Sequence, residues 1–201
     1  MEVREDPIYL RASLSANCNL DCIYCPTEIG MENQVPNSLK GKKLSVEQYC
    51  NNLAKFANKG IKAITFTGGE PTFNSDIVNI VSFARKIFER VEITTNGFML
   101  NQYISQLAPF LDVVKISLDA IDRDVFERIT QRKYNELITA LNSIESCCKL
   151  GLKVAVNVVV LKENINQIEK IINLCSDLNK KYSDNIYVSL LDFYFSLAKR
   201  T

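Results

Sequence analysis

The sequence predicts an α/β protein built on a parallel sheet of six strands. Three observations predict this fold class. Short β-branched runs alternate with longer amphipathic stretches. The runs are almost continuously apolar, as buried parallel strands are, and capping residues stand at the junctions. Strand–helix alternation with right-handed crossovers pairs the strands in parallel. Periodicity leaves two architectures open, a doubly wound sheet and an incomplete β/α barrel.

Six apolar runs are expected to form the strands, at residues 8–15, 61–67, 91–95, 113–118, 154–160 and 186–191. In both architectures ligands gather at the carboxyl ends of the strands. The residues with the most distinctive chemistry follow these ends. They are a cysteine cluster after the first strand, Gly68-Gly69-Glu70 after the second, Asn96-Gly97 after the third and Asp119 after the fourth.

Helical patterns fill most of the connections. Ser45 is the expected cap of the first helix, and Ser75 or Asp76 that of the second. The connection 26–43 is long and polar, which is typical of lids and disordered segments. Further helices are expected at 101–107, 124–129, 135–150 and from Asn164 or Asn166 to position 180, with Gly60 and Gly151 as stop signals.

Composition narrows the class of protein. The 201 residues are 47% hydrophobic and 23% charged, which fits a globular domain that buries its core without disulfides. The net charge is +1, so no nucleic-acid partner is expected. No apolar run approaches the ~20 residues of a bilayer span, and residues 1–7 are polar rather than signal-like. We therefore expect no membrane partner and a cytoplasmic location. Residues 1–201 are assigned to one core domain, with any C-terminal auxiliary domain outside this chain.

The cysteines indicate metal binding rather than disulfides. Three of the seven stand together in Cys18-Asn-Leu-Asp-Cys22-Ile-Tyr-Cys25, and the chain has no histidine to act as a zinc ligand or general base. Thiolates are the standard ligands of iron–sulfur clusters, and a closed cubane takes four. Three close cysteines therefore indicate a 4Fe–4S cluster with one open iron. The alternative is a zinc site completed by a remote thiolate, drawn from Cys50, Cys147, Cys148 and Cys175, which lie on expected helices.

The turn Thr67-Gly-Gly-Glu-Pro71 follows the second strand. Paired glycines let a ligand approach the backbone closely and expose amide donors. Glu70 adds an acceptor suited to an ammonium group, and the methionine part of S-adenosylmethionine (SAM) carries both an ammonium and a carboxylate. The plain alternative is a tight strand-to-loop turn. The position of the Thr67–Pro71 motif, one β/α unit after the cysteines, favours a ligand site.

In combination, these motifs resemble the radical SAM superfamily. Within it, the chain is similar to the branch of molybdenum-cofactor GTP 3′,8-cyclases and SPASM-type peptide-maturing enzymes. The matching pieces follow one another in the family's order over residues 8–190. They are Leu10-Arg-Ala-Ser-Leu-Ser15, Tyr24, Thr67-Gly-Gly-Glu-Pro71, Thr94-Thr-Asn-Gly97, Ile116-Ser-Leu-Asp-Ala120 and Val156-Asn-Val-Val-Val160.

The resemblance implies a partial (β/α)6 TIM-like barrel with SAM across the strand ends and Cys18, Cys22 and Cys25 as cluster ligands. A branched side chain at Gly69 would then occupy the space of the methionine moiety. Asp119 either caps the following helix or belongs to the site. The other implied contacts are Tyr24 with the adenine, Gly68, Gly69 and Glu70 with the methionine amine, Ser117 with the methionine carboxylate or ribose, Asn157 with the ribose, and Thr95 and Asn96 with cofactor or substrate.

The implied activity is reductive cleavage of SAM at the cluster, with an electron from flavodoxin or ferredoxin. The resulting 5′-deoxyadenosyl radical would abstract hydrogen from an organic substrate, either a peptide or a small metabolite, while the protein supplies orientation. A glycyl-radical activase is a second enzymatic interpretation, which the motifs at Ser117 and Asn157 disfavour. A non-catalytic iron–sulfur or zinc module would not need the Gly-Gly-Glu-Pro turn.

The substrate is expected not to be GTP. Basic residues contact the triphosphate in the cyclases of this branch, and the resemblance places Arg11 at one such position but Thr65 and Ala155 at two others. Burying a triphosphate without cations or amide donors is costly. Lys62 and Lys115 are the candidates to compensate, and the family's second cluster motif does not occur in this sequence. A GTP 3′,8-cyclase of molybdenum cofactor synthesis is the alternative.

Overall fold

The computed structural model describes residues 9–25, 44–182 and 184–192. The interpretation of residues 26–43 as a lid or disordered segment lies outside these ranges. Six strands form one sheet in the order β1-β2-β3-β4-β5-β6, and every neighbouring pair is parallel. The strands are β1 (Tyr9–Ser15), β2 (Ala63–Gly68), β3 (Arg90–Thr95), β4 (Val113–Ser117), β5 (Val154–Val160) and β6 (Ile186–Asp192).

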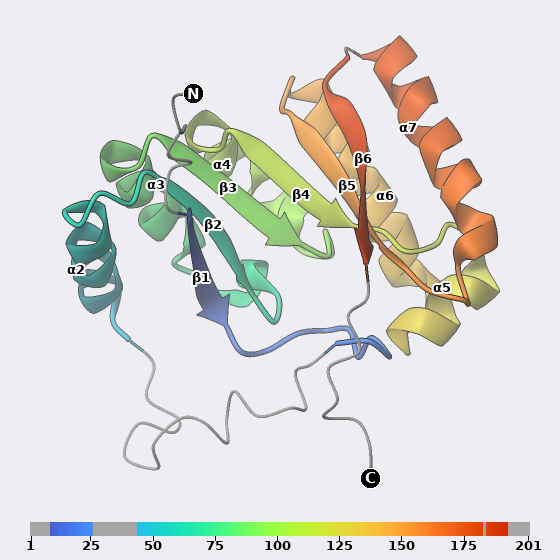
Figure 1. Ribbon diagram of the computed structural model, residues 1–201, viewed down its shortest axis with the longest axis horizontal. Coiled ribbons are helices and arrows are strands. Elements are labelled where there is room, and N and C mark those ends of the chain that lie inside the picture. Colours follow the sequence, from blue (N-terminus) through green and yellow to red (C-terminus); the bar gives the residue numbers. More distant parts are fainter. Residues whose placement is uncertain (1–8, 26–43, 183, 193–201) are drawn as a thin grey trace, which may run out of the picture.

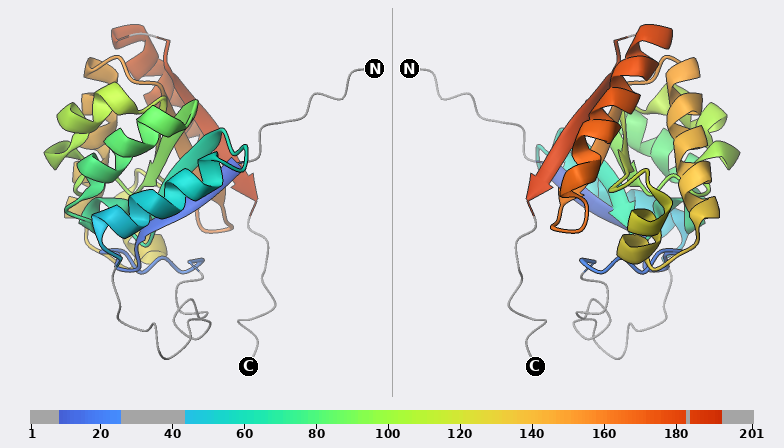
Figure 2. Two further views of the ribbon diagram at one scale, coloured as in Figure 1. Left: turned by 90° about the vertical axis from the view of Figure 1, so that its left-hand side faces the viewer. Right: turned by 90° about the vertical axis from the view of Figure 1, so that its right-hand side faces the viewer.

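This strand order decides between the two architectures that periodicity left open. A doubly wound sheet reverses its strand order at a switch point, whereas here the order in space is the order in the chain. Figures 1 and 2 show a curved sheet whose helices lie along one face, while the concave face stays open. The expected partial (β/α)6 barrel is confirmed.

Helices connect the strands close to the expected positions. Among the described residues, no helix is both long and apolar enough to cross a membrane. The α-helices are α2 (Val46–Ala57), α3 (Ile77–Ile87), α4 (Ile104–Leu107), α5 (Arg123–Thr130), α6 (Tyr134–Lys149) and α7 (Ile168–Lys181), and short 3-10 turns lie at Pro71–Phe73, Leu100–Gln102, Ala108–Phe110 and Ile165–Gln167.

Local signals explain most helix ends. Ser45 caps α2 through a capping box with Gln48, as expected. The residue before α3 is Asp76, but its side chain makes no capping bond. The cap of α5 is Asp122, which accepts from the amides of the first turn, so Asp119 does not fill that role. Gly151 adopts a φ of 70° after α6, the left-handed conformation that glycine favours at a helix end.

The two faces of the sheet differ in character. The face under the helices is apolar, and Ile64, Phe66 and Ile116 are fully buried there. The intervening residues, such as Thr67, Thr94 and Ser117, are half-buried and polar. Side chains alternate between faces along a strand, so the concave face of the barrel presents hydroxyl, amide and charged groups. This face is suited to hold a polar ligand.

Candidate cofactor site

The chemically distinctive residues converge on one cavity at the carboxyl ends of β1–β4. The cavity has a volume of about 260 Å³, and all three cysteines of the motif line it. None of the residues in the loop 16–25 belongs to a helix or strand, and contacts from other elements help to fix its shape. The remaining lining residues with polar side chains or glycine are Arg11, Asn19, Tyr24, Thr67, Gly68, Gly69, Thr94, Thr95, Asn96, Ser117, Asp119, Thr130 and Glu136.

The paired glycines hold the cysteine loop from below. The Gly69 amide donates to the Ser15 carbonyl at 2.6 Å, and the Glu70 amide donates to the Asn17 carbonyl at 2.7 Å. A Cβ on Gly69 would lie 2.4 Å from the Asn17 carbonyl oxygen, inside van der Waals contact. Two expectations were therefore wrong. These amides are not exposed donors, and a side chain at Gly69 would meet the protein backbone before any ligand.

The end of α5 holds the same loop from the other side. Asp21 and Ile23 donate their amides to the carbonyls of Thr130 and Ile129, at 3.0 and 2.9 Å. Arg132, just after the helix, donates from Nε to the Asn19 carbonyl at 2.5 Å. The last carbonyls of a helix have no partners within it, so the cysteine loop satisfies them. Sequence reasoning missed Arg132, because nothing local indicates that it reaches a loop more than a hundred residues earlier.

Glu70 joins the ends of β2 and β3. Its side chain is 1% exposed. Its Oε1 accepts from the Thr72 hydroxyl and the Thr95 hydroxyl, both at 2.6 Å, and from the Thr72 amide at 3.1 Å. Its Oε2 accepts from the Asn96 amide at 2.7 Å. Burial raises the pKa of Glu70 despite these donors. Glu70 is not among the residues that line the cavity, and its contact with an ammonium group stays a prediction.

Tyr24 and Asp119 connect the cysteine motif to β4 and β5. The Tyr24 hydroxyl donates to Asp119 Oδ2 at 2.5 Å. The Val159 amide donates to Asp119 Oδ1 at 2.7 Å. Burial raises the pKa of Asp119 to about 6, and the two donors oppose this shift. Of the two roles left open for Asp119, the structure therefore favours the one in the site.

The other expected contacts lie close to the cavity. Thr95 is buried and its hydroxyl donates to Glu70, while Ser117 lines the cavity. Asn157 pairs with Ser117 in the register of β4 and β5 but lies outside the cavity lining. Asn96 lines the cavity, and its side-chain amide lies 3.6 Å from the Cys18 sulfur. The structure thus gathers every predicted contact at one end of the barrel.

The donor set fits an iron–sulfur cluster and a polar cofactor. Three thiols face the cavity, and two buried polar atoms there, Asn19 Nδ2 and Glu136 Oε2, have no hydrogen-bond partner within the described chain. Such atoms are rare unless a ligand or water meets them. Burial is the main cause that raises the pKa of Cys22 to about 12, and a bound metal would reverse this shift. Within the described ranges no three His, Cys, Asp or Glu side chains converge tightly enough for a single metal ion.

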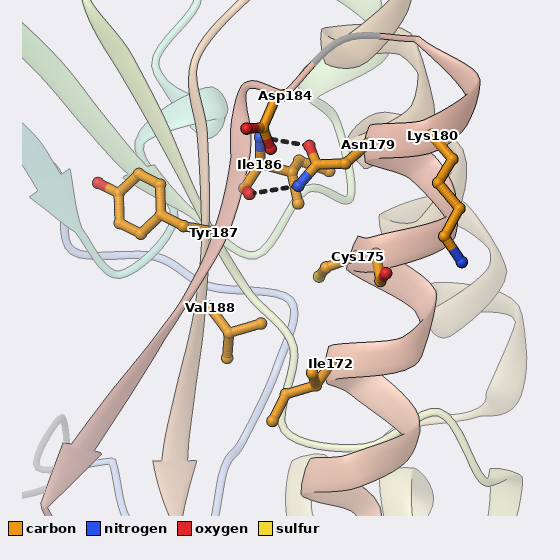
Figure 3. A pocket seen from close by; sticks show the side chains of 9 residues that line it. Ile172, Cys175, Asn179, Lys180, Asp184, Ile186, Tyr187 and Val188 are labelled. Atoms are coloured by element: carbon orange, nitrogen blue, oxygen red, sulfur yellow. Dashed lines mark hydrogen bonds between the residues drawn. The ribbon is translucent and has the colours of Figure 1, made fainter.

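The four remaining cysteines lie away from this cavity. Cys147 and Cys148 are buried on α6, Cys50 on α2 and Cys175 on α7. Cys175 borders a separate hollow of about 540 Å³ between α7 and β6 (Figure 3). Asn179 closes one end of this hollow by exchanging two hydrogen bonds of 2.9 Å with the Ile186 backbone. These thiols are small apolar groups of the core.

A second polar cluster crosses the barrel interior at the opposite ends of β1–β4. Glu92 is 1% exposed at its centre. Its Oε2 accepts from Tyr9, from Thr65 at 3.0 Å and from Lys115 at 2.5 Å, and its Oε1 accepts from Arg90 at 2.6 Å. We call these five residues the Glu92 network. Its single carboxylate is shared by two cations, Lys115 and Arg90, whose side chains are 24% and 56% exposed.

The fold and the cavity define a class of protein. The model of the radical SAM superfamily matches residues 13–175, most of the chain, which therefore belongs to that superfamily. Members of the superfamily use a 4Fe–4S cluster and SAM. The class inferred from the cysteine spacing and the Gly-Gly-Glu-Pro turn is confirmed.

Particular relatives agree with the branch that the sequence resembles. Molybdenum cofactor biosynthesis protein 1 of Drosophila melanogaster is 39% identical over 77% of this chain and 27% of its own length. GTP 3′,8-cyclase of Petrotoga mobilis is 34% identical over 92% of this chain and 61% of its own length. The chain thus spans between a quarter and two thirds of these relatives. SuiB of Streptococcus suis has a TM-score of 0.76 at 18% identity, over 97% of this chain and 42% of that one, a likeness of fold alone.

Proposed function

We propose that this chain is the core of a radical SAM enzyme in which Cys18, Cys22 and Cys25 hold a 4Fe–4S cluster with one iron open to SAM. The observation that carries the proposal is the convergence of three thiols, the paired glycines and the polar ends of β3 and β4 on one cavity. When bound, the cofactors supply reductive cleavage of SAM and a 5′-deoxyadenosyl radical that abstracts hydrogen from an organic substrate.

The residues of the chain bind and orient. Asp119 fixes the Tyr24 side chain, so the backbone beside Cys25 is held still for the adenine. Gly68 and Gly69 bring the backbone of β2 against the loop, beside the position proposed for the methionine amine. Ser117 would contact the methionine carboxylate or ribose, and Asn157 the ribose. The groups that are proposed to orient SAM are therefore held in place by contacts with neighbouring strands.

The electron donor is proposed to be a one-electron carrier such as flavodoxin or ferredoxin. Cys18 is exposed, so a cluster bound there lies near the surface and within reach of a docked carrier. All seven cysteines are free thiols, which favours a reducing, cytoplasmic location.

The charge of the barrel interior favours a substrate other than GTP. Lys115 is held by Glu92 at 2.5 Å, and Lys62 is held by Glu89 at 3.0 Å. Neither lysine lines the cavity, so neither is placed there to compensate for the missing cations. Thr65 and Ala155 are 2% and 1% exposed and carry no charge. Arg11 is the one basic residue that lines the described cavity. One arginine suits a single anionic group better than a triphosphate, so a peptide or a small metabolite is the proposed substrate.

Anaerobic reconstitution tests the cluster. We expect about four irons and four sulfides per chain, with 5′-deoxyadenosine formed when SAM and dithionite are added. Cys18→Ala should lose the iron and the 5′-deoxyadenosine. Cys147→Ala removes a thiol that is buried in the core, so it should keep the iron at a stability cost of about 1 kcal/mol.

Iron and sulfide analysis, with chromatography of 5′-deoxyadenosine, checks these outcomes. Cys175→Ala is a second control, since this thiol also lies in the core. Loss of the cluster from either core variant would contradict the three-ligand assignment.

A GTP assay tests the substrate assignment. Two missing contacts to charged groups, each contributing about 1.5–3 kcal/mol, should weaken GTP binding by about a hundredfold or more. We therefore expect no cyclised nucleotide from full-length protein given GTP, SAM and dithionite under nitrogen. The GTP 3′,8-cyclase of Petrotoga mobilis, assayed in parallel, is the positive control. Cyclised product at the rate of that control would refute the charge argument and establish the alternative function.

A further inference from the structure

We infer that Asn96 is a positioning residue for Cys18 and sets the reduction potential of the cluster that Cys18 would bind. The inference rests on the proposed function, because it takes Cys18 as a cluster ligand. Two donors face the Cys18 sulfur: the Asn96 Nδ2 group at 3.6 Å and the Leu20 amide at 3.4 Å. The first comes from the residue that follows β3, 78 residues away, so the tertiary fold places it there.

The amide of Asn96 is held in one orientation. Its Oδ1 accepts from the Phe98 amide at 2.9 Å, and its Nδ2 also donates to Asn19 Oδ1 at 2.7 Å. A flipped amide would place oxygen against oxygen at Asn19 and nitrogen against a donor at Phe98. Both contacts would become repulsive. The second hydrogen of Nδ2 is therefore directed to the sulfur.

The backbone of Asn96 is held as firmly as its side chain. Its amide donates to Glu70 Oε2 at 2.7 Å. Glu70 is buried and anchored by Thr72 and Thr95. A continuous chain of hydrogen bonds therefore runs from the turn after β2, through β3, to the cysteine sulfur. This gives Glu70 a function that needs no direct contact with a ligand.

The cysteine itself is fixed on both sides. The carbonyl before it, of Asn17, accepts from the Glu70 amide at 2.7 Å. The carbonyl after it, of Asn19, accepts from Arg132 at 2.5 Å. Because the donor and the sulfur are both held by other elements, their separation is a property of the fold rather than of a mobile side chain.

The contact has a direct electrochemical consequence. Reduction adds negative charge to the cluster and its thiolates, and a hydrogen bond to a ligand sulfur stabilises the more negative state. Such hydrogen bonds are among the factors that set cluster potentials. Asn96 should thus raise the potential and make the cluster easier to reduce, so removing the donor should lower it.

Two variants isolate this effect in the full, reconstituted chain. Asn96→Ser keeps an oxygen that can accept from the Phe98 amide, as serine does in turns, but it cannot reach the sulfur. Asn96→Asp is isosteric and puts a negative charge in place of the donor. The matched control is Asn135→Ala, which removes an exposed amide from α6. The midpoint potential is measured by redox titration followed by electron paramagnetic resonance, without substrate.

We expect Asn96→Ser to lower the ratio of reduced to oxidised cluster about tenfold at a fixed applied potential. This corresponds to a decrease of about 59 mV in the midpoint potential for one electron. Asn96→Asp should shift it further in the same direction, and Asn135→Ala should match the wild type. If the Ser variant loses iron, the isosteric Asp variant provides the same comparison. A wild-type potential in an Asn96 variant with four irons would overturn the inference. Failure of the unaltered chain to assemble any cluster would instead overturn the proposed function.

Discussion

Gly69→Ala is expected to abolish cluster assembly. The new Cβ would lie 2.4 Å from the Asn17 carbonyl oxygen and 2.8 Å from that of Ala16. Both are backbone atoms, so no rotamer change relieves the clash, and the loop that carries Cys18 must move. Overpacking of this kind costs about 3 kcal/mol or more when the backbone has to shift. We expect loss of most iron after reconstitution and a lower melting temperature, measured by iron analysis and circular dichroism.

Gly60→Ala is the matched control for this prediction. Gly60 has a φ of 90°, so alanine is strained there, but nothing lies within 4 Å of its Cβ position. This variant should lose about 1 kcal/mol of stability and keep its four irons. A Gly69→Ala chain with full iron and tight SAM binding would show that the loop moves freely. The sequence alone predicted a different result, in which a side chain at Gly69 blocked SAM but spared the cluster.

The strands could be predicted because their signal is local. The run at 154–160 coincides with β5, and the other runs end within a few residues of their strands. Each strand is a short run rich in apolar and β-branched residues, so neighbouring residues identify it. The caps at Ser45 and Gly151 are local in the same sense. The choice between barrel and doubly wound sheet was not local, because it depends on the order of strands in space.

The sequence predicted which residues belong to the site but not which contacts they make. The motif supplied the cysteines, and the strand ends supplied the lining residues. What Glu70 contacts could not be read from its surroundings, because Thr95 and Asn96 lie 25 and 26 residues away. Asp119 was ambiguous for the same reason, since its partners come from the cysteine loop and β5. Arg132 and Glu136 carry no motif signal at all.

Glu92→Gln is the substitution with the other large expected effect. Glutamine can accept hydrogen bonds but cannot neutralise Lys115 or Arg90, so the network would keep two cations and lose its anion. Removing one partner of a fully buried ion pair costs about 3–5 kcal/mol, and the lower end applies here because Lys115 and Arg90 are 24% and 56% exposed. We expect a loss of about 3 kcal/mol in the free energy of unfolding at pH 7. Glu89→Gln is the control, because the pair of Glu89 with Lys62 is exposed and should contribute less than about 1 kcal/mol.

Glu92→Gln should also change how the free energy of unfolding depends on pH. Desolvation alone would raise the pKa of Glu92, but hydrogen bonds from Lys115, Tyr9 and Arg90 outweigh it and lower the pKa to about 2. An unfolded glutamate has a pKa of about 4.3, so the folded state favours the anion. The stabilisation is complete above the unfolded pKa and is lost as the pH falls towards the folded one. Urea unfolding of the iron-free chain between pH 7 and pH 3 should therefore show the wild-type and Glu92→Gln free energies converging below about pH 4. Parallel curves over that range would mean that Glu92 is not held as a buried anion, and that the barrel interior has free cations after all.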